Sequence, residues 1–314
     1  MNQKKPISLI GTSKSLQEML KKIVGVAKTD LPVLLTGEIG SGLEEVAREI
    51  HAQSLRSRGP FVTVAYASLT KGHAERELFG EVGDESKNKS AQIGKLEFAD
   101  RGTLFLDQVD RLPTEVQEKL LRVFSEKKMI PVGSQVLTPV DVRVIACFGP
   151  NIDPASEKSS FLKDLFDFLN ASPLSVPSLR ERREDIPELI EYFLKIANQK
   201  AKVPVKNIQK EAIQFLTQYA WPGNLKELEN SVEMMAIFAG KDTLTLEDIP
   251  LDILVKQIDL AKTKEEAKLS LKRVRRQFER QYIRKVLERT RGNQTRTAAT
   301  LGLHRNTLIW KLKE

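Results

Sequence analysis

Residues 31–46, LPVLLTGEIGSGLEEV, constrain the fold more than any other stretch of the chain. Residues 33–36 are an apolar run of strand length, residues 37–42 are rich in glycine, and helical spacing begins directly afterwards. This order is typical of a phosphate-binding P-loop, in which glycines let backbone N–H groups surround a phosphate and a lysine reaches the outer oxygens. Gly37 and Gly42 have the spacing that a P-loop requires, but the position of its lysine holds Leu43. The sequence therefore predicts the shape of a phosphate site without its usual charge.

A second apolar strand, predicted at residues 102–109, ends in Asp107. Further strands are predicted at 61–66, 141–147 and 174–176, with helices at 14–27 and 75–79 and another that Pro113 opens. Strands that alternate with helices predict a parallel, three-layer α/β domain. A strand that carries a P-loop and another that ends in aspartate favour nucleotide binding at the carboxyl edge of the sheet.

The pattern changes to helices alone after residue 186, and basic residues gather near the C-terminus. Helices are predicted at 187–199, 208–219, 224–239 and 246–254, followed by a long basic helix and two short helices, 295–301 and 304–313. The two short helices have the spacing of a helix-turn-helix. Residues 255–314 carry 17 Lys and Arg against 6 Asp and Glu, whereas the rest of the chain is nearly neutral. This asymmetry favours a nucleic-acid-binding end over a merely solvated helix.

Several classes of protein are excluded by composition. Cys147 is the only cysteine, which rules out an internal disulfide and fits a reducing, cytoplasmic compartment. No apolar run approaches the roughly 20 residues that span a bilayer, so we expect no membrane association. The sequence has no Cys/His cluster, and we predict no metal site.

The ordered motifs resemble those of the sigma-54-dependent transcriptional activators, also called bacterial enhancer-binding proteins. The resemblance is carried by LIGTSKSLQEM, LLTGEIGSG, EIHAQS, GPFVTV, ELFGE, GKLEFADRGTLFLDQV, VQEKLLRVF, VDVRVIA, LRERREDIP and WPGNLKELEN, and by the C-terminal GNQTRTAATLGLHRNTLIWKLK, which is similar to a Fis-type DNA-binding domain. It implies an AAA+ α/β sub-domain at 1–185, a helical lid at 186–255, a linker at 256–267 and a helix-turn-helix domain at 268–314. Since the chain begins just before the core motifs, we expect the family's N-terminal regulatory domain to be absent.

The chain departs from the family at the positions that carry its chemistry. Leu43 replaces the phosphate-binding lysine, and Gln108 replaces the glutamate that polarises the attacking water, although an amide cannot act as a general base. Leu162 and Phe168 stand where the family has two arginine fingers, and Lys226 replaces a lid arginine. Gly149 aligns with a sensor asparagine, with Asn151 close by. These joint changes predict a pseudo-ATPase with no catalytic residue; slow hydrolysis is the alternative.

Nucleotide binding without turnover stays open in this interpretation. The retained positions that could hold ATP, ADP or another nucleotide are Gly37, Glu38, Gly40, Ser41, Gly42, Asp107 and Lys226. No cofactor is predicted to be required. The family's sigma-54-contacting GAFTGA sequence is replaced by the charged EVGDESKNKSAQI, and we therefore expect no contact with sigma-54 RNA polymerase.

The C-terminal helices carry the predicted DNA contacts. Ala298, Ala299, Leu301, Leu303, Leu308 and Leu312 are expected to form a small core. Arg305 suits guanine and Asn306 suits adenine in the major groove, whereas Thr295, Arg296, Thr307 and Lys311 suit phosphate oxygens. Trp310 either touches a thymine methyl group or completes the core. His304 is expected to cap the second helix or to lie on the surface.

An apolar stripe on the basic helix 268–291 favours self-association over a free surface helix, and the family resemblance implies a dimer that reads two-fold-related double-stranded DNA. A higher oligomer of the core stays open. The leading hypothesis is thus a sequence-specific DNA-binding transcription regulator whose core has lost ATP hydrolysis and sigma-54 contact. The alternatives are a weakly active ATPase acting as a divergent sigma-54-dependent activator, and an interaction module that regulates other activators.

Overall fold

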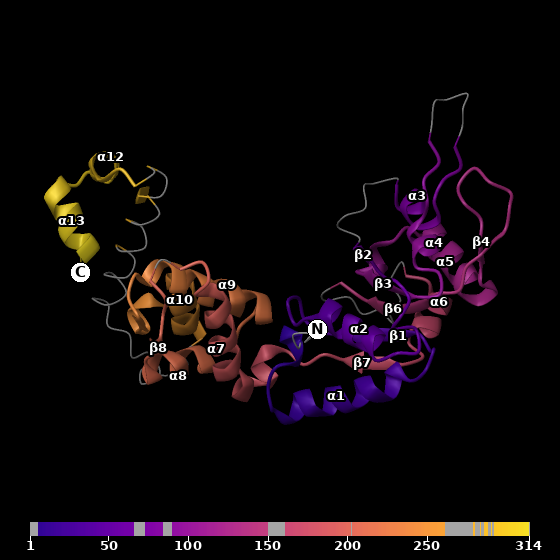
Figure 1. The fold of residues 1–314 in the computed structure, drawn as a ribbon, viewed down its shortest axis with the longest axis horizontal. Coiled ribbons are helices and arrows are strands. Elements are labelled where there is room, and N and C mark those ends of the chain that lie inside the picture. Colours follow the sequence, from indigo (N-terminus) through magenta and orange to yellow (C-terminus); the bar gives the residue numbers. More distant parts are fainter. Residues whose placement is uncertain are drawn as a thin grey trace. The chain divides into compact units, whose positions relative to one another are not determined.

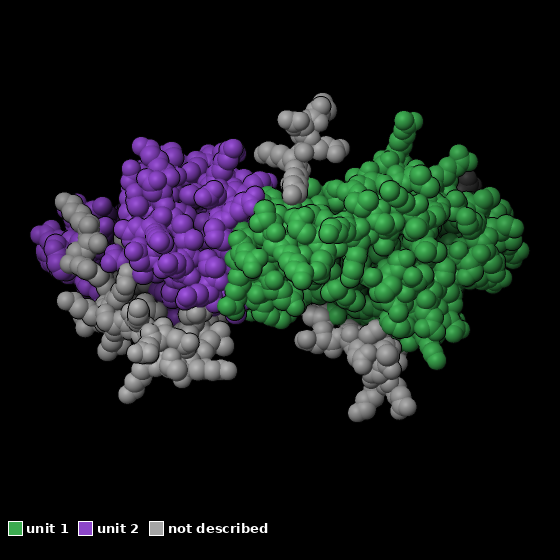
Figure 2. Space-filling view, turned by 90° about the horizontal axis from the view of Figure 1, so that it is seen from below, with its two compact units in different colours: residues 1–185, 222–226 green, residues 186–221, 227–314 purple. Residues whose placement is uncertain are grey.

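The computed structural model describes residues 6–65, 73–83, 90–149, 161–201, 203–260 and 292–313, together with positions 279, 283, 286, 287 and 290. The chain divides into two compact units (Figure 2). Unit 1 contains residues 1–185 and 222–226, and unit 2 contains residues 186–221 and 227–314. The predicted apolar stripe of the basic helix, formed by Leu271, Val274, Phe278 and Tyr282, lies outside the described residues.

Unit 1 is built on a five-stranded parallel sheet in the order β2-β3-β6-β1-β7 (Figure 1). Its strands are β1 Val33–Thr36, β2 Phe61–Ala65, β3 Thr103–Asp107, β6 Arg143–Cys147 and β7 Pro173–Ser175. The predicted parallel α/β architecture is therefore confirmed. Because β1, β6 and β3 pair in parallel, the loop after β1 and the carboxyl end of β3 lie at the same edge of the sheet, with β6 between them.

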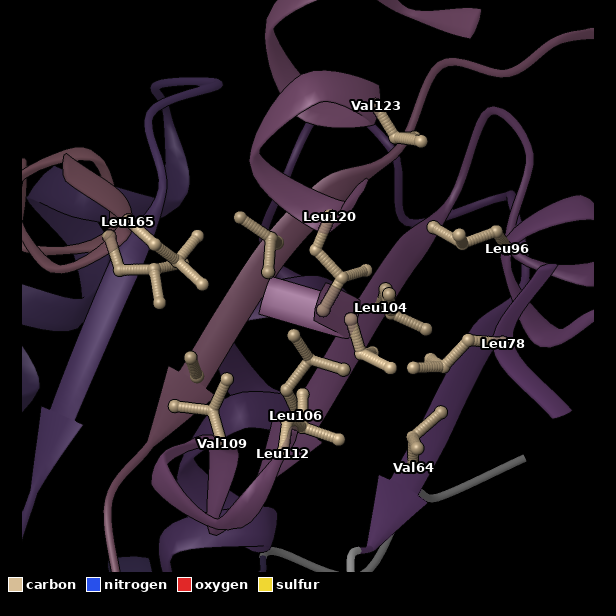
Figure 3. Close-up of a cluster of buried hydrophobic side chains, with 14 of the residues drawn as sticks. Val64, Leu78, Leu96, Leu104, Leu106, Val109, Leu112, Leu120, Val123 and Leu165 are labelled. Atoms are coloured by element: carbon tan, nitrogen blue, oxygen red, sulfur yellow. The ribbon is translucent and has the colours of Figure 1, made fainter. Parts of the chain in front are cut away.

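Helices cover both faces of this sheet. Successive strand residues point to opposite sides, and because those on both sides are apolar, each face is buried against helices. Val33, Leu35 and Phe105 pack in one cluster with apolar residues of α1 and α2, whereas Leu104 and Leu106 pack in a second cluster with α3 to α6. Figure 3 shows this second cluster, to which Leu120 of α5 and Leu165 of α6 also contribute. The helices are α1 Lys14–Ala27, α2 Leu43–Ala52, α3 Ala74–Phe79, α4 Lys95–Phe98, α5 Thr114–Glu126 and α6 Lys163–Leu169.

Short elements complete unit 1. They are the antiparallel pair β4 Lys128–Met129 and β5 Thr138–Pro139, and the 3-10 turns η1 Ile7–Leu9, η4 Val109–Arg111, η5 Leu179–Glu181 and η6 Arg183–Asp185. A buried ion pair, Arg182 with Asp185, ties η1 to the turns after β7. Asp185 accepts hydrogen bonds from the backbone of Thr12 and Ser13, and Arg182 donates to the carbonyl of Ser8. These bonds place Ser8 beside the glycine-rich loop, where its Cβ would lie 2.5 Å from a Cβ on Gly42.

Unit 2 is mainly helical, as predicted. It contains α7 Ile186–Ala197, α8 Lys210–Gln218, most of α9 Asn224–Ala239, α10 Leu251–Leu260, α12 Gln294–Thr300 and α13 Arg305–Lys313, with the turn η7 Leu246–Asp248. The helix expected from residue 208 begins at Lys210, because β8 Asn207–Ile208 pairs with β9 Thr243–Leu244. Helix α10 continues to Leu260, into the first residues of the expected linker. Trp221 is fully buried, and its indole donates to the carbonyl of Leu216 at 2.8 Å.

Candidate nucleotide and DNA sites

The glycine-rich loop leads from β1 directly into the first turn of α2. Gly40 and Gly42 have φ angles of +76° and +97°, a conformation that side chains disfavour, and Ser41 N donates to Glu38 O across a tight turn at 3.1 Å. Gly42 is the N-cap of α2 and has no side chain that could cap the helix. The N–H groups of the first helical turn therefore have no side-chain cap at this end of the loop. The partial positive charge of a helix N-terminus favours an anion at this place.

The turn at residues 222–226 lies against this loop within unit 1. Leu225 N donates to Gly40 O at 3.0 Å, and a Cβ on Gly40 would lie well inside contact distance of Gly223 O. Two main-chain segments far apart in sequence therefore approach each other more closely than any side chain at Gly40 would permit. Lys226, predicted as a nucleotide contact, is exposed at the end of this turn.

A polar cluster joins the loop to the segment after β7. Arg180 binds both carboxylate oxygens of Glu38, and Asn224 Nδ2 donates to Glu38 Oε2 at 3.2 Å and to Ile39 O at 3.0 Å. Asn224 Oδ1 accepts from Leu179 N at 2.8 Å. The hydrogen bond from Arg180 holds the pKa of Glu38 below its ordinary value, and Glu38 in turn raises the pKa of Arg180. Sequence reasoning missed Arg180, although it lies in the quoted LRERREDIP motif.

The position of the missing lysine is filled by an apolar contact. Leu43 is half-buried and packs against the cluster formed by α1, α2 and the sheet. Its side chain extends back over the loop, so that a Cβ on Gly37 would lie 3.1 Å from Leu43 Cδ2. The first residue of α2 therefore supplies packing where the family pattern supplies charge.

Asp107 lies at the carboxyl end of β3, as predicted, on the same sheet edge as the loop. Cys147, at the end of the neighbouring β6, donates to Asp107 Oδ1 at 3.0 Å, and burial raises the pKa of its thiol. Gln108 follows with φ +55°, which turns the chain into η4. Within the described part of the chain, no group of three or more His, Cys, Asp and Glu residues could hold a metal ion.

The two arginine-finger positions are part of the packing of unit 1. Leu162 and Phe168 are half-buried against the second cluster, and the ring of Phe168 stacks on Phe124 with centroids 5.7 Å apart. Gly149, aligned with the sensor asparagine, donates its N–H to the buried Asp110. Asn151 lies outside the described residues.

The core of the helix-turn-helix contains five of the six residues that the sequence pattern predicts, together with Ile283. Ile283, Ala298 and Leu308 are buried, with Leu301, Leu303 and Leu312 partly buried against them. The prediction that Ala299 packs in this core is wrong, because Ala299 is exposed while its neighbour Thr297 is fully buried. The hydroxyl of Thr297 lies 2.6 Å from that of Thr290 and donates to Asn293 O at 2.8 Å, which explains how a polar residue fits there.

Most predicted DNA contacts are exposed on α12 and α13, namely Thr295, Arg296, Arg305, Asn306, Thr307 and Trp310. Trp310 is 58% exposed, which removes the alternative that it completes the core. Lys311 is half-buried and forms an ion pair with Glu279, so its ammonium already has a carboxylate partner. His304 Nδ1 accepts from Asn306 N at 3.4 Å, the expected capping contact, and Asn293 Oδ1 caps α12 by accepting from Arg296 N.

Three family models match the chain in sequence order. They are described as Sigma-54 interaction domain, at residues 9–175, AAA+ ATPase lid domain, at residues 180–266, and Bacterial regulatory protein, Fis family, at residues 274–314. The chain is 36% identical to the nitrogen assimilation regulatory protein NtrX of Azorhizobium caulinodans, over 98% of this chain and 69% of that protein.

Solved structures of NtrX from Brucella abortus are similar to this chain over nearly its full length. The complex with ATP is 37% identical, with a TM-score of 0.71, and covers 97% of this chain and 68% of that one. The complex with ADP is also 37% identical with a TM-score of 0.71, and covers 98% and 68%. The predicted α/β core, helical lid and helix-turn-helix agree with these matches.

These comparisons contradict the prediction of a pseudo-ATPase, which is wrong. A chain of the same architecture holds ATP, and the matched family models are those of ATPase regulators. The error arose because the substitutions at Leu43 and Gln108 were interpreted as loss of the whole activity. The expected loss of sigma-54 contact has no support either, since the Sigma-54 interaction domain spans the divergent residues 81–93, of which 84–89 lie outside the described residues. No helix in the described ranges is long and apolar enough to cross a membrane.

Proposed function

The chain belongs to the family of sigma-54-dependent transcriptional activators, and on this basis we propose that it is a DNA-binding regulator that binds ATP or ADP at the loop 37–42. The observation that carries the proposal is the loop itself. Gly40 and Gly42 adopt left-handed backbone at the N-terminus of α2, which directs main-chain donors at one place. A nucleotide phosphate is the ligand that such a loop suits in this fold.

Hydrolysis by this chain is proposed to be slow. Asp107 has the position of a residue that holds Mg²⁺ through water, but Gln108 cannot remove a proton from the attacking water. Leu162 and Phe168 offer no charge to the transition state, and an arginine finger contributes about 10³–10⁵ in rate where it is present. The proposed activity is therefore that of a weakly active, divergent sigma-54-dependent activator.

Phosphate release from Mg-ATP tests the nucleotide proposal. We expect purified wild-type protein to bind ATP in an equilibrium titration and to release phosphate slowly, and Asp107→Asn to lose the release. Glu118→Gln is the matched control, because Glu118 is an exposed carboxylate of α5. Absence of ATP binding by the folded wild-type chain would overturn the proposal.

Selection of bound sequences from random double-stranded DNA tests the regulator proposal. The wild-type chain is expected to enrich a two-fold-related site, and the variant Arg305→Ala/Asn306→Ala is expected to lose that preference while it remains folded. The selected site then allows transcription by sigma-54 RNA polymerase to be measured with and without ATP. Stimulation that depends on ATP supports the proposed partner, and an unchanged transcript level contradicts it.

A further inference from the structure

The loop 37–42 must neutralise several negative charges if it binds a nucleoside di- or triphosphate, and the first turn of its own helix supplies no cation. Leu43 packs into the apolar cluster of α1 and α2, while Glu44 and Glu45 occupy the rest of the first turn. Backbone N–H groups carry only partial charges. A site of this kind therefore gains strongly from a positive side chain that another segment brings to the loop.

Two buried serine hydroxyls at the loop have no hydrogen-bond partner among the described residues. Ser41 is 2% exposed, and its Oγ, which has no hydrogen-bond partner among the described residues, lies 3.0 Å from the place of a Cβ on Gly37. Ser8 is fully buried against Gly42, and its Oγ is likewise without a partner in the described part of the chain. Buried hydroxyls without partners are costly, so both favour a ligand that accepts hydrogen bonds.

Arg180 is a cation already attached to this loop. Its guanidinium binds Glu38 end-on, with Nη1 donating to Oε2 at 2.8 Å and Nη2 donating to Oε1. This arrangement engages one N–H of each terminal nitrogen, and three of the five guanidinium N–H groups remain for other acceptors. The side chain is 46% exposed, so that a ligand in the loop can reach it.

Asn224 holds both partners of this pair in place. Its amide oxygen accepts from Leu179 N, next to Arg180, while its amide nitrogen donates to Glu38 and to Ile39 O. One buried side chain therefore fixes the distance between the backbone beside Arg180 and the backbone of the loop. A guanidinium whose orientation is set before binding loses little freedom when it meets a phosphate.

We propose that Arg180 binds the outer phosphates of the nucleotide and supplies the charge that Leu43 does not, an inference that rests on the proposed nucleotide binding. Glu38 then orients Arg180, and the hydroxyls of Ser41 and Ser8 add donors to the same ligand. A planar guanidinium suits this role because it can donate two parallel hydrogen bonds to phosphate oxygens.

Calorimetric titration of the full chain with ATP, ADP and adenosine tests this role. We expect Arg180→Gln to weaken ATP binding about tenfold or more, as for loss of a charge-assisted contact, and to leave adenosine binding unchanged. Arg122→Gln is the matched control, because Arg122 also forms an exposed pair with a glutamate, Glu126, and should bind ATP as the wild type does. Adding Leu43→Lys to Arg180→Gln should restore ATP binding.

The outcomes separate this inference from the proposed function. Equal ATP affinities of wild type and Arg180→Gln would overturn the role of Arg180 and leave nucleotide binding intact. Equal weakening of ATP and adenosine would also overturn it, because it would indicate a purely structural role. If the folded wild-type chain binds none of the three ligands, the proposed nucleotide binding fails and the role of Arg180 fails with it. Rescue by Leu43→Lys shows that an Arg180→Gln defect is one of charge and not of folding.

Discussion

The glycine-rich loop and the helix-turn-helix hold their proposed contact atoms in different ways. In the loop, the donors are main-chain groups whose positions follow from backbone angles and from the close approach of Gly40 to Gly223. In the helix-turn-helix, the proposed DNA contacts are mostly exposed side chains on α12 and α13, and Ala298 and Leu308 are among the described residues buried in its core. Substitutions therefore have different meanings in the two regions.

A side chain can change at the loop while the arrangement of its donors survives. Leu43 illustrates this, because it fills its position with an apolar contact and leaves the left-handed glycines where they are. On α13 the reverse holds, since an exposed residue such as Arg305 can change without any effect on the fold but alters what the surface contacts. The loss of a side chain is therefore stronger evidence for a change of function in the helix-turn-helix than in the glycine-rich loop.

The largest effect that sharpens this comparison is expected from Leu308→Ala. Leu308 is fully buried at the centre of the small core, so its truncation should reduce the stability of the helix-turn-helix by about 2–5 kcal/mol. Trp310→Ala is the control two residues away, and should change stability by no more than about 0.5 kcal/mol because the indole is exposed. Hydrogen exchange of α12 and α13 amides measures both. Equal losses would mean that Trp310 is part of the core.

The next effect is expected at the loop, from Gly40→Ala. The new methyl group meets Gly223 O at a backbone angle that alanine disfavours, which should cost about 1–3 kcal/mol and weaken ATP binding. Gly25→Ala is the matched control, because Gly25 lies in α1 with nothing within 4 Å of the new Cβ, and should leave stability unchanged or raise it by up to about 1 kcal/mol. Urea unfolding of both variants gives the comparison, and a neutral Gly40→Ala would show that the loop tolerates a different backbone.

These differences also explain what the sequence could predict. The apolar runs at 33–36 and 102–109 predicted strands correctly, because residues buried on both faces of a parallel sheet leave a continuous apolar pattern. Arg180 was missed because its partner Glu38 is 142 positions away, and only tertiary structure joins them. Ala299 was misplaced because its apolar side chain was given more weight than helical spacing, which places Thr297, four positions before Leu301, on the buried face instead. The pseudo-ATPase prediction failed because it gave more weight to the substituted side chains, such as Leu43 and Gln108, than to the main-chain donors that the loop retains.

A smaller effect distinguishes a side chain that contacts DNA phosphate from one that recognises bases in the helix-turn-helix. Arg296 is exposed at the first turn of α12 and is predicted to contact phosphate, so Arg296→Ala should weaken binding to all DNA sequences to a similar degree. Loss of one phosphate contact should reduce the slope of log affinity against log salt by about 0.9. Lys195→Ala, which removes an exposed lysine of α7, serves as the control. Fluorescence anisotropy over a salt series measures both slopes, and a change of preference among sequences would contradict a phosphate role.

The smallest effect is expected from a buried histidine in α2, the helix that follows the glycine-rich loop. His51 of α2 is 8% exposed, with Nδ1 2.9 Å from Thr103 Oγ1, and burial lowers its pKa below the ordinary value of 6.5. Between the lowered pKa and 6.5 the unfolded chain binds a proton that the native state does not. The free energy of unfolding therefore decreases as the pH is lowered below about 6.5, and the contribution of His51 is fully present above that pH. His51→Gln should remove this component of the pH dependence, whereas Thr103→Val should keep it, because burial and not the hydroxyl is the main cause. Urea midpoints at pH 5 and pH 7.5 test this. An identical pH dependence in wild type and His51→Gln would mean that His51 opens to solvent more readily than the tight packing behind the loop implies.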